Sequence, residues 1–273
     1  MTDRRRFLLC AAATAVPAAL AIPSSAQAAL RRVAFLSPFP RTDVDYFLGL
    51  LRPELAKLGW IEGRNIVVLE PRTTEGRTER LPTLAADIVA QAPDVILVQS
   101  APATRAAMQA TASIPIVMVS VGNPIEYGIV ASYTKPGGNV TGTTFLADES
   151  ILKLLQLLLQ AVPGLRSVAV FANPTNEAAA PMIRKVRENA AARGIRTQIV
   201  EVSTPADFEP GFAAIRRERT ESMLLPPEPL IRSRRDAIGE FALREKLPLA
   251  VVGQARYLPA GGLIGYSPAV AQY

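Results

Sequence analysis

The sequence contains no histidine and a single cysteine, Cys10, and aromatic residues make up only 6% of its 273 residues. Without histidine, the chain lacks the base of Ser-His and Cys-His catalytic arrangements and the commonest protein ligand of metal ions. Cys10 lies in an N-terminal leader, so the rest of the chain has no thiol nucleophile, no disulfide and no cysteine-ligated zinc. We therefore predict that the protein is not an enzyme and has no metal site and no cofactor.

Residues 1–28 have the pattern of a secretory signal peptide. The basic tripeptide Arg4–Arg6 precedes an apolar run that ends at Ile22, and Ala26–Ala28 supplies small residues for cleavage. The arginines and the residues after them also resemble a twin-arginine signal, so the export route, Sec or twin-arginine, stays open. The alternative is a membrane anchor, but the apolar run is shorter than the roughly 20 residues that span a bilayer. We predict cleavage near Ala28 and a periplasmic protein.

The charge of the chain is only moderately basic. The formal net charge of +6 falls to +4 without Asp3 and the three arginines of the leader, which leaves 27 basic and 23 acidic residues. The remaining basic residues are scattered, and their small clusters lie beside acids on predicted helices. This pattern favours solvated helix faces over a nucleic-acid-binding patch, so we predict no nucleic-acid partner.

After the leader, short β-branched runs alternate with helical stretches, which is typical of βαβ units and parallel sheets. The alternation runs twice, with a break near residues 145–150. We therefore predict an α/β fold of two doubly wound parallel-sheet lobes, joined by a hinge and separated by an interlobe cleft. The N-terminal α/β lobe would span residues 29–145 and the C-terminal α/β lobe residues 146–273.

We expect a helix over Asp43–Leu58, with Asp43 as its N-cap and Gly59 ending it. A second is expected over Ile125–Ser132, before a strong turn signal, and a third runs unbroken over Ile231–Glu245.

In open parallel sheets, ligands bind beyond the carboxyl ends of the strands. Polar or aromatic residues stand at or just after these ends in both halves, and free backbone N–H groups at the helix starts suit an anion. The predicted ligand-binding residues are Ser37, Ser100, Thr104, Asn123, Phe145, Asn173, Glu228 and Tyr266. The alternative for each polar residue is a helix cap or a turn, and Phe145 and Tyr266 can equally belong to the core.

Among these residues, Glu228 gives the most specific prediction about the ligand. It lies between two prolines at a strand end, where a fixed carboxylate can pair with the ammonium group of a ligand. The alternative is a surface acid at the start of the helix Ile231–Glu245, stabilised by the positive end of that helix. With hydroxyls and N–H groups on the other lobe, the pattern indicates an amino-acid-like ligand.

The chain resembles a known family. It is similar to the ABC transporter substrate-binding proteins of the TrpX-like group, which have a type I periplasmic-binding fold, and the resemblance runs from the leader to Tyr273. The motifs that carry it, in chain order, are Arg4–Leu8, Leu58–Asn65 (LGWIEGRN), Ala92–Ile96 (APDVI), Ile114–Val117 (IPIV), Asn123-Pro124, Lys135–Gly142 (KPGGNVTG) and Ala260–Ile264 (AGGLI).

The resemblance implies an extracytoplasmic receptor that hands a small molecule to an inner-membrane ABC permease with a cytoplasmic ATPase. Some relatives bind aromatic amino acids, and by position the ligand shell would be the eight residues named above. Two departures stand out. The usual Pro-Asp-Pro is Pro227-Glu228-Pro229 here, and relatives continue beyond Ala271–Tyr273, which implies an incomplete C-terminal lobe.

Three functions are compatible with the sequence. The first is a monomeric solute-binding component of an ABC import system, which captures its ligand by lobe closure. The second is a sensory ligand-binding module for a membrane receptor, and the third is an exported enzyme, which the missing histidine and cysteine disfavour. A repressor of related architecture would need an N-terminal helix-turn-helix where this chain has a signal peptide.

Overall fold

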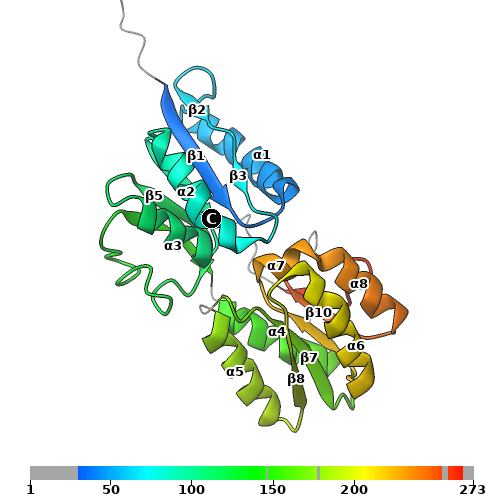
Figure 1. Cartoon of the computed structure of the whole chain (residues 1–273). Coiled ribbons are helices and arrows are strands. Elements are labelled where there is room, and N and C mark those ends of the chain that lie inside the picture. Colours follow the sequence, from blue (N-terminus) through cyan, green and yellow to red (C-terminus); the bar gives the residue numbers. More distant parts are fainter. Residues whose placement is uncertain (1–29, 146, 177–178, 254–257, 267–273) are drawn as a thin grey trace, which may run out of the picture.

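The computed structural model describes residues 30–145, 147–176, 179–253 and 258–266. The predicted signal peptide, residues 1–28, therefore lies outside the described residues. Figure 1 shows two groups of helices and strands, and the chain passes from the first to the second between β6 (Val140–Phe145) and α4 (Ala147–Ala161). In the described ranges, no helix is long and apolar enough to span a bilayer.

The first lobe is built on a parallel sheet in the order β2-β1-β4-β5-β6, with the short β3 paired to β1. Its elements are β1 (Arg31–Ser37), α1 (Arg41–Lys57), β2 (Ile66–Val68), β3 (Arg72–Thr73), the 3-10 turn η1 (Thr78–Arg80), α2 (Leu81–Ala90), β4 (Val95–Gln99), α3 (Ala101–Ala110), β5 (Ile116–Gly122) and β6 (Val140–Phe145). The strand order reverses beside β1, so β1 and β4 flank a topological switch point.

The second lobe repeats this plan with the strand order β11-β10-β9-β7-β8, again all parallel. Its elements are α4 (Ala147–Ala161), β7 (Ser167–Ala172), α5 (Ala180–Ala191), β8 (Arg196–Glu201), the 3-10 turn η3 (Pro205–Asp207), α6 (Phe208–Glu218), β9 (Met223–Leu225), α7 (Pro229–Ser233), α8 (Arg235–Arg244), β10 (Leu249–Val252) and β11 (Ile264–Tyr266). Here β7 and β9 flank the switch point.

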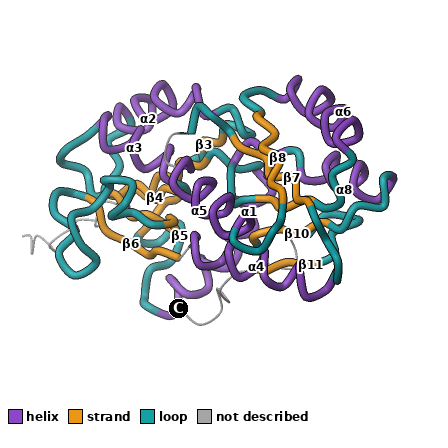
Figure 2. Tube along the Cα trace, turned by 90° about the horizontal axis from the view of Figure 1, so that it is seen from below, coloured by secondary structure: helices purple, strands orange, loops and turns teal. Residues whose placement is uncertain are grey.

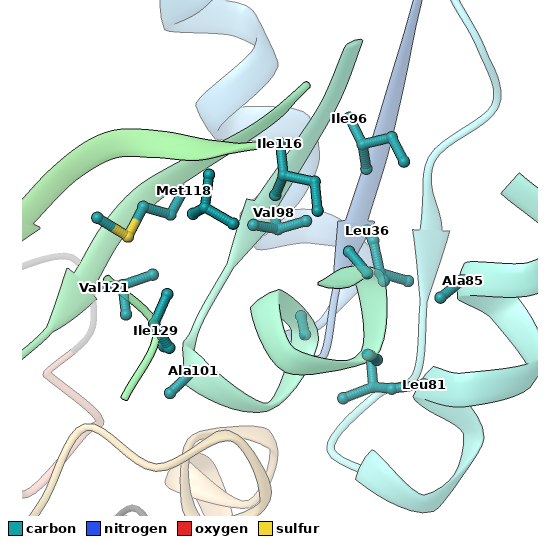
Figure 3. Close-up of a cluster of buried hydrophobic side chains, with 14 of the residues drawn as sticks. Leu36, Leu81, Ala85, Ile96, Val98, Ala101, Ile116, Met118, Val121 and Ile129 are labelled. Atoms are coloured by element: carbon teal, nitrogen blue, oxygen red, sulfur yellow. The ribbon is translucent and has the colours of Figure 1, made fainter. Parts of the chain in front are cut away.

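Each sheet is covered by helices on both faces, which is why its strands are apolar on both sides. In the first lobe, Leu36, Ile96, Val98 and Ile116 pack with residues of α2 and α3, as Figure 3 shows, while α1 covers the other face through Val44 and Leu48. Seen from below, the strands of the two lobes form two separate groups (Figure 2). These features confirm the predicted pair of parallel-sheet α/β lobes.

A group of stacked phenylalanines fills one face of the second sheet. The Phe212 and Phe241 rings lie 4.3 Å apart and nearly parallel, and Phe171 and Phe208 pack beside them. All four side chains are buried. Aromatic pairs of this kind add to the stabilisation that comes from burying apolar area.

Phe212→Ala is expected to lower the free energy of unfolding by about 3–5 kcal/mol, because it opens a cavity among rings that cannot collapse into it. Leu243→Ala, at an exposed position of the neighbouring α8, is the control and is expected to stay within about 0.5 kcal/mol of the parent. Urea unfolding followed by circular dichroism measures both. Equal losses in the two variants would contradict the assignment of Phe212 to the core.

Two helix predictions are wrong in detail. Residues 125–132 form turns instead of a helix, since Pro124 precedes them and Gly128 takes a positive φ of 66°. The predicted helix Ile231–Glu245 is two helices, α7 and α8, which meet at Arg234. Their packing against the sheet through Leu230, Ile231, Ile238 and Phe241 outweighs the local preference for one continuous helix.

Candidate functional site

In each lobe, a hydrogen-bonded polar pair stands at the switch point. In the first lobe, the hydroxyl of Ser37, the last residue of β1, donates to Oε1 of Gln99 at the end of β4, at 2.8 Å. In the second lobe, the Asn173 amide after β7 donates to Oε1 of Glu228 after β9, at 3.0 Å. Since switch points of open parallel sheets are where ligands bind, these two pairs mark the candidate site.

Glu228 is buried, with 2% of its surface exposed, and it is the N-cap of α7. Its Oε2 accepts the backbone N–H of Ile231 at 2.9 Å. Within the described residues, no lysine or arginine forms an ion pair with it, and every hydrogen-bond donor to it is neutral. Burial raises the pKa of this carboxyl above its usual range, because its ionised form is poorly solvated and only partly compensated by the N–H donors.

Asn173 holds this carboxyl group in place. Its Oδ1 accepts hydrogen bonds from the backbone N–H and the hydroxyl of Thr175, at 3.0 and 2.7 Å. The amide is thus oriented with its NH₂ group toward Glu228. A buried carboxylate that is held by neutral donors at a switch point can form an ion pair with a cationic group of a ligand.

Ser37 is fully buried, and its hydroxyl is used twice within the chain. Besides donating to Gln99, it accepts the backbone N–H of Phe39 at 3.1 Å, which shapes the loop between β1 and α1. Sequence reasoning missed Gln99, because its place beside Ser37 follows from the pairing of β1 with β4.

Ser100 lies between β4 and α3 with φ 74° and ψ 158°, a backbone region that is almost confined to glycine. Its hydroxyl accepts the N–H of Ala103 at a long 3.5 Å, so it caps α3 weakly. Thr104 is buried, and its hydroxyl donates to the Ser100 carbonyl at 2.7 Å. Strained residues of this kind concentrate at binding sites, and the first turn of α3 offers its N–H groups and positive end to an anion.

Asn123 and the two aromatic residues lie at other strand ends. Asn123 follows β5 with φ 44°, and its amide lies 3.4 Å from Oε2 of Glu126. Phe145 ends β6 and is half-buried against the second-lobe core. Tyr266 ends β11, at the edge of the second sheet, and is 37% exposed.

One further polar group went unnoticed in the sequence. Thr74 follows the two-residue strand β3, and its N–H donates to the Ser37 carbonyl. Its side chain is fully buried, and in the described part of the chain its hydroxyl has no hydrogen-bond partner. No sequence pattern predicts so short a strand, so this hydroxyl beside the switch point is visible only in the fold.

A surface groove and the acidic side chains are other candidates for a site. A groove of about 530 Å³ lies between α5 and β8, where Arg184, Arg187 and Arg196 line it, and it contains none of the predicted ligand residues. Among the described residues, no group of three or more Asp, Glu, Cys or His is arranged to hold a metal ion.

Several known proteins are similar to this chain. A tyrosine-binding protein of Clostridioides difficile is 26% identical over 191 residues, which is 70% of this chain and 54% of that protein. The chain thus spans about half the length of this curated relative. Two crystal structures share the fold: a conserved domain protein of Vibrio cholerae and a domain of Streptococcus pneumoniae in complex with L-Trp.

The Vibrio cholerae structure matches with a TM-score of 0.78 at 24% identity, and the L-Trp complex with a TM-score of 0.75 at 18% identity. Each match covers 87% of this chain and 79% of the other. These likenesses confirm the type I periplasmic-binding fold. The model of the family "ABC transporter substrate binding protein" matches residues 49–269, more than half of the sequence, and the chain therefore belongs to the family of ABC transporter substrate-binding proteins.

Proposed function

We propose that this protein is the extracytoplasmic solute receptor of an ABC import system and that it binds an amino-acid-like ligand between its lobes. The observation that carries the ligand class is Glu228, a buried carboxylate at a switch point whose hydrogen-bond donors are neutral. A ligand ammonium group would supply the missing positive charge, and this is a favourable use of a carboxylate that is already desolvated.

The opposite end of the ligand belongs to the first lobe in this proposal. A carboxylate would bind at the first turn of α3, where Ser100 caps the helix weakly and the helix dipole favours negative charge. Ser37, Thr104 and Asn123 would add polar contacts, and the free hydroxyl of Thr74 is a further donor. In the second lobe, Asn173 would hold Glu228 in position.

An aromatic amino acid is the ligand we favour. The C. difficile relative is named for tyrosine binding, and Phe145 and Tyr266 are partly exposed rings at strand ends that would stack on a ligand side chain. We further propose that the predicted signal peptide exports the protein, that the protein is a monomer, and that it transfers its ligand to a membrane permease.

A thermal-shift screen tests the function directly. L-tyrosine, L-tryptophan and L-phenylalanine are each added to the purified protein, with 3-(4-hydroxyphenyl)propionate, which lacks the ammonium group, as a matched control. A ligand at about 100 times its Kd stabilises the folded state by about 2.7 kcal/mol, which raises Tm by roughly 5–10 °C for a chain of this size. No shift with any amino acid would reject the proposed ligand class.

A further inference from the structure

Among the described residues, charged side chains join the two lobes at two places. The first is the Asp43 cluster, made of Asp43 in the first turn of α1, Arg232 in α7 and Arg235 in α8. The second is the Lys185 cluster, made of Lys185 in α5, Asp148 in α4 and Glu126 in the loop after β5. Figure 1 shows α7 at the end of the second lobe that faces the first.

The Asp43 cluster is a well-formed interlobe contact. Nε of Arg232 lies 2.8 Å from Oδ2 of Asp43, and Nη1 of Arg235 lies 3.4 Å from the same carboxylate. The Arg232 guanidinium also lies over the Phe39 ring, 4.7 Å from its centre. Phe39 and Asp43 belong to the first lobe and both arginines to the second, so every one of these contacts crosses between the lobes.

Burial makes this contact stronger than an ordinary surface ion pair. The Asp43 side chain is 7% exposed, and those of Arg232 and Arg235 are 20% and 23% exposed. Surface pairs contribute little because water and salt screen them. A carboxylate this deeply buried is costly to leave unpaired, so its attraction to two arginines resists any motion that separates the lobes.

The Lys185 cluster repeats the arrangement with more exposed groups. Lys185 pairs with Asp148 inside the second lobe, and its Nζ lies 3.3 Å from Oε2 of Glu126 in the first lobe. The Lys185 and Glu126 side chains are 40% and 36% exposed. Asp148 thus fixes Lys185, and the interlobe step to Glu126 is weaker and more easily screened.

We propose that Asp43 and Arg232 are positioning residues that hold the lobes closed before any ligand arrives, with Glu126 and Lys185 as a weaker second contact. Opening breaks the 2.8 Å ion pair and lifts Arg232 from Phe39, so the closed population depends on ionic strength. If the proposed function holds, a solute enters only when this contact opens, and the Asp43 cluster limits the association rate.

Single-molecule energy transfer between the lobes tests the proposal without any ligand. Ala86 in α2 and Ala213 in α6 are exposed and lie in different lobes, so each is replaced by cysteine and labelled. In a full chain that also carries Cys10→Ser, the two introduced thiols are the only ones. The closed and open populations are then counted in low salt and in 1 M NaCl.

Asp43→Asn is expected to lower the ratio of closed to open molecules by about tenfold or more, because two arginines then face each other without a carboxylate between them. The matched control is Asp45→Asn, which removes the same charge from the same helix but breaks the pair with Arg41 inside the first lobe. It is expected to leave the ratio unchanged, and Lys185→Gln is expected to cause a smaller decrease than Asp43→Asn.

Changing the salt concentration tests the contact without substituting any of its residues, so a folding defect in a variant cannot explain the result. In the unsubstituted interface, raising the ionic strength to about 1 M shortens the screening length to about 3 Å, and we expect the open population to grow. Equal populations in Asp43→Asn and Asp45→Asn, or populations that do not respond to salt, would overturn the proposal. Because no ligand is present, these results stand apart from the thermal-shift screen, which alone decides the proposed ligand class.

Discussion

Glu228→Gln is expected to weaken the binding of L-tyrosine by more than about tenfold, while leaving the binding of 3-(4-hydroxyphenyl)propionate nearly unchanged. The substitution removes the negative charge that would face the ligand ammonium and keeps the size of the side chain. Isothermal titration calorimetry on the variant and the parent measures both affinities. The difference between the two ligands isolates the ammonium contact, because any general damage to the site weakens both.

The structure adds a second consequence of the same change. Glu228 accepts hydrogen bonds from the Ile231 N–H and from the Asn173 amide, and glutamine has only one acceptor oxygen to meet them. A moderate loss of Tm without ligand is therefore expected. Glu149→Gln is the matched control, since Glu149 is an exposed acid in the first turn of α4. If both ligands lose affinity equally in Glu228→Gln, the residue caps α7 and does not touch the ammonium.

The pH dependence gives an independent check on Glu228. Burial raises the pKa of this carboxyl in the folded protein. Its contribution to folding stability is therefore fully present below the pKa that it has in the unfolded chain, and this contribution is lost as pH rises through the pKa in the folded protein. Ligand affinity has the opposite sign, because only the ionised carboxylate attracts an ammonium group. As pH falls from neutral, L-tyrosine affinity is expected to decrease at a higher pH than an ordinary glutamate would give, and this decrease should vanish in Glu228→Gln.

Gly142→Ala is expected to cost about 3 kcal/mol or more of folding stability. Gly142 lies in β6 with φ 138°, and a Cβ there would stand 2.0 Å from the carbonyl oxygen of Met118 and 2.7 Å from its nitrogen. Neither atom belongs to a flexible side chain, so β5 and β6 must separate where they pair, and the positive φ adds backbone strain. Urea unfolding is the direct measurement.

The effect of Gly142→Ala should reach the site as well. β6 ends at Phe145, just before the chain enters the second lobe. A displacement of β6 therefore changes the position of one lobe relative to the other. Gly49→Ala is the control: Gly49 lies inside α1, nothing is within 4 Å of its added Cβ, and alanine should stabilise the helix by up to about 1 kcal/mol. A Gly142→Ala protein as stable as the parent would contradict the described pairing of β5 with β6.

Much of the architecture follows from local pattern. The apolar runs that form β1, β4, β7 and β10 are short and rich in Val, Ile and Leu, which a strand buried on both faces requires. The turn residues between them predict the alternation of strands and helices. The same pattern also indicates where strands end, so the sequence correctly brings Ser37, Ser100, Asn173 and Glu228 to the carboxyl edges of the two sheets.

The partners of these residues did not follow from the pattern. The pairing of Ser37 with Gln99 and of Asn173 with Glu228 depends on which strands are neighbours, and the sequence does not specify the order of the strands in a sheet. Asp43 shows the limit most clearly. It is predicted as the N-cap of its helix, but Pro40 holds that position, and the carboxylate instead pairs with Arg232, 189 residues away.

By itself, the sequence determined the class of fold, the two-lobed plan and the polar residues that stand at the strand ends, because hydrophobic period and turn chemistry are local properties of the chain. Only the tertiary structure decided which polar groups meet at the switch points, that Glu228 is buried among neutral donors, and that Asp43 joins the lobes. These outcomes depend on burial and on contacts between distant residues. Burial increases both the cost of desolvating a charge and the strength of its interactions with other charges.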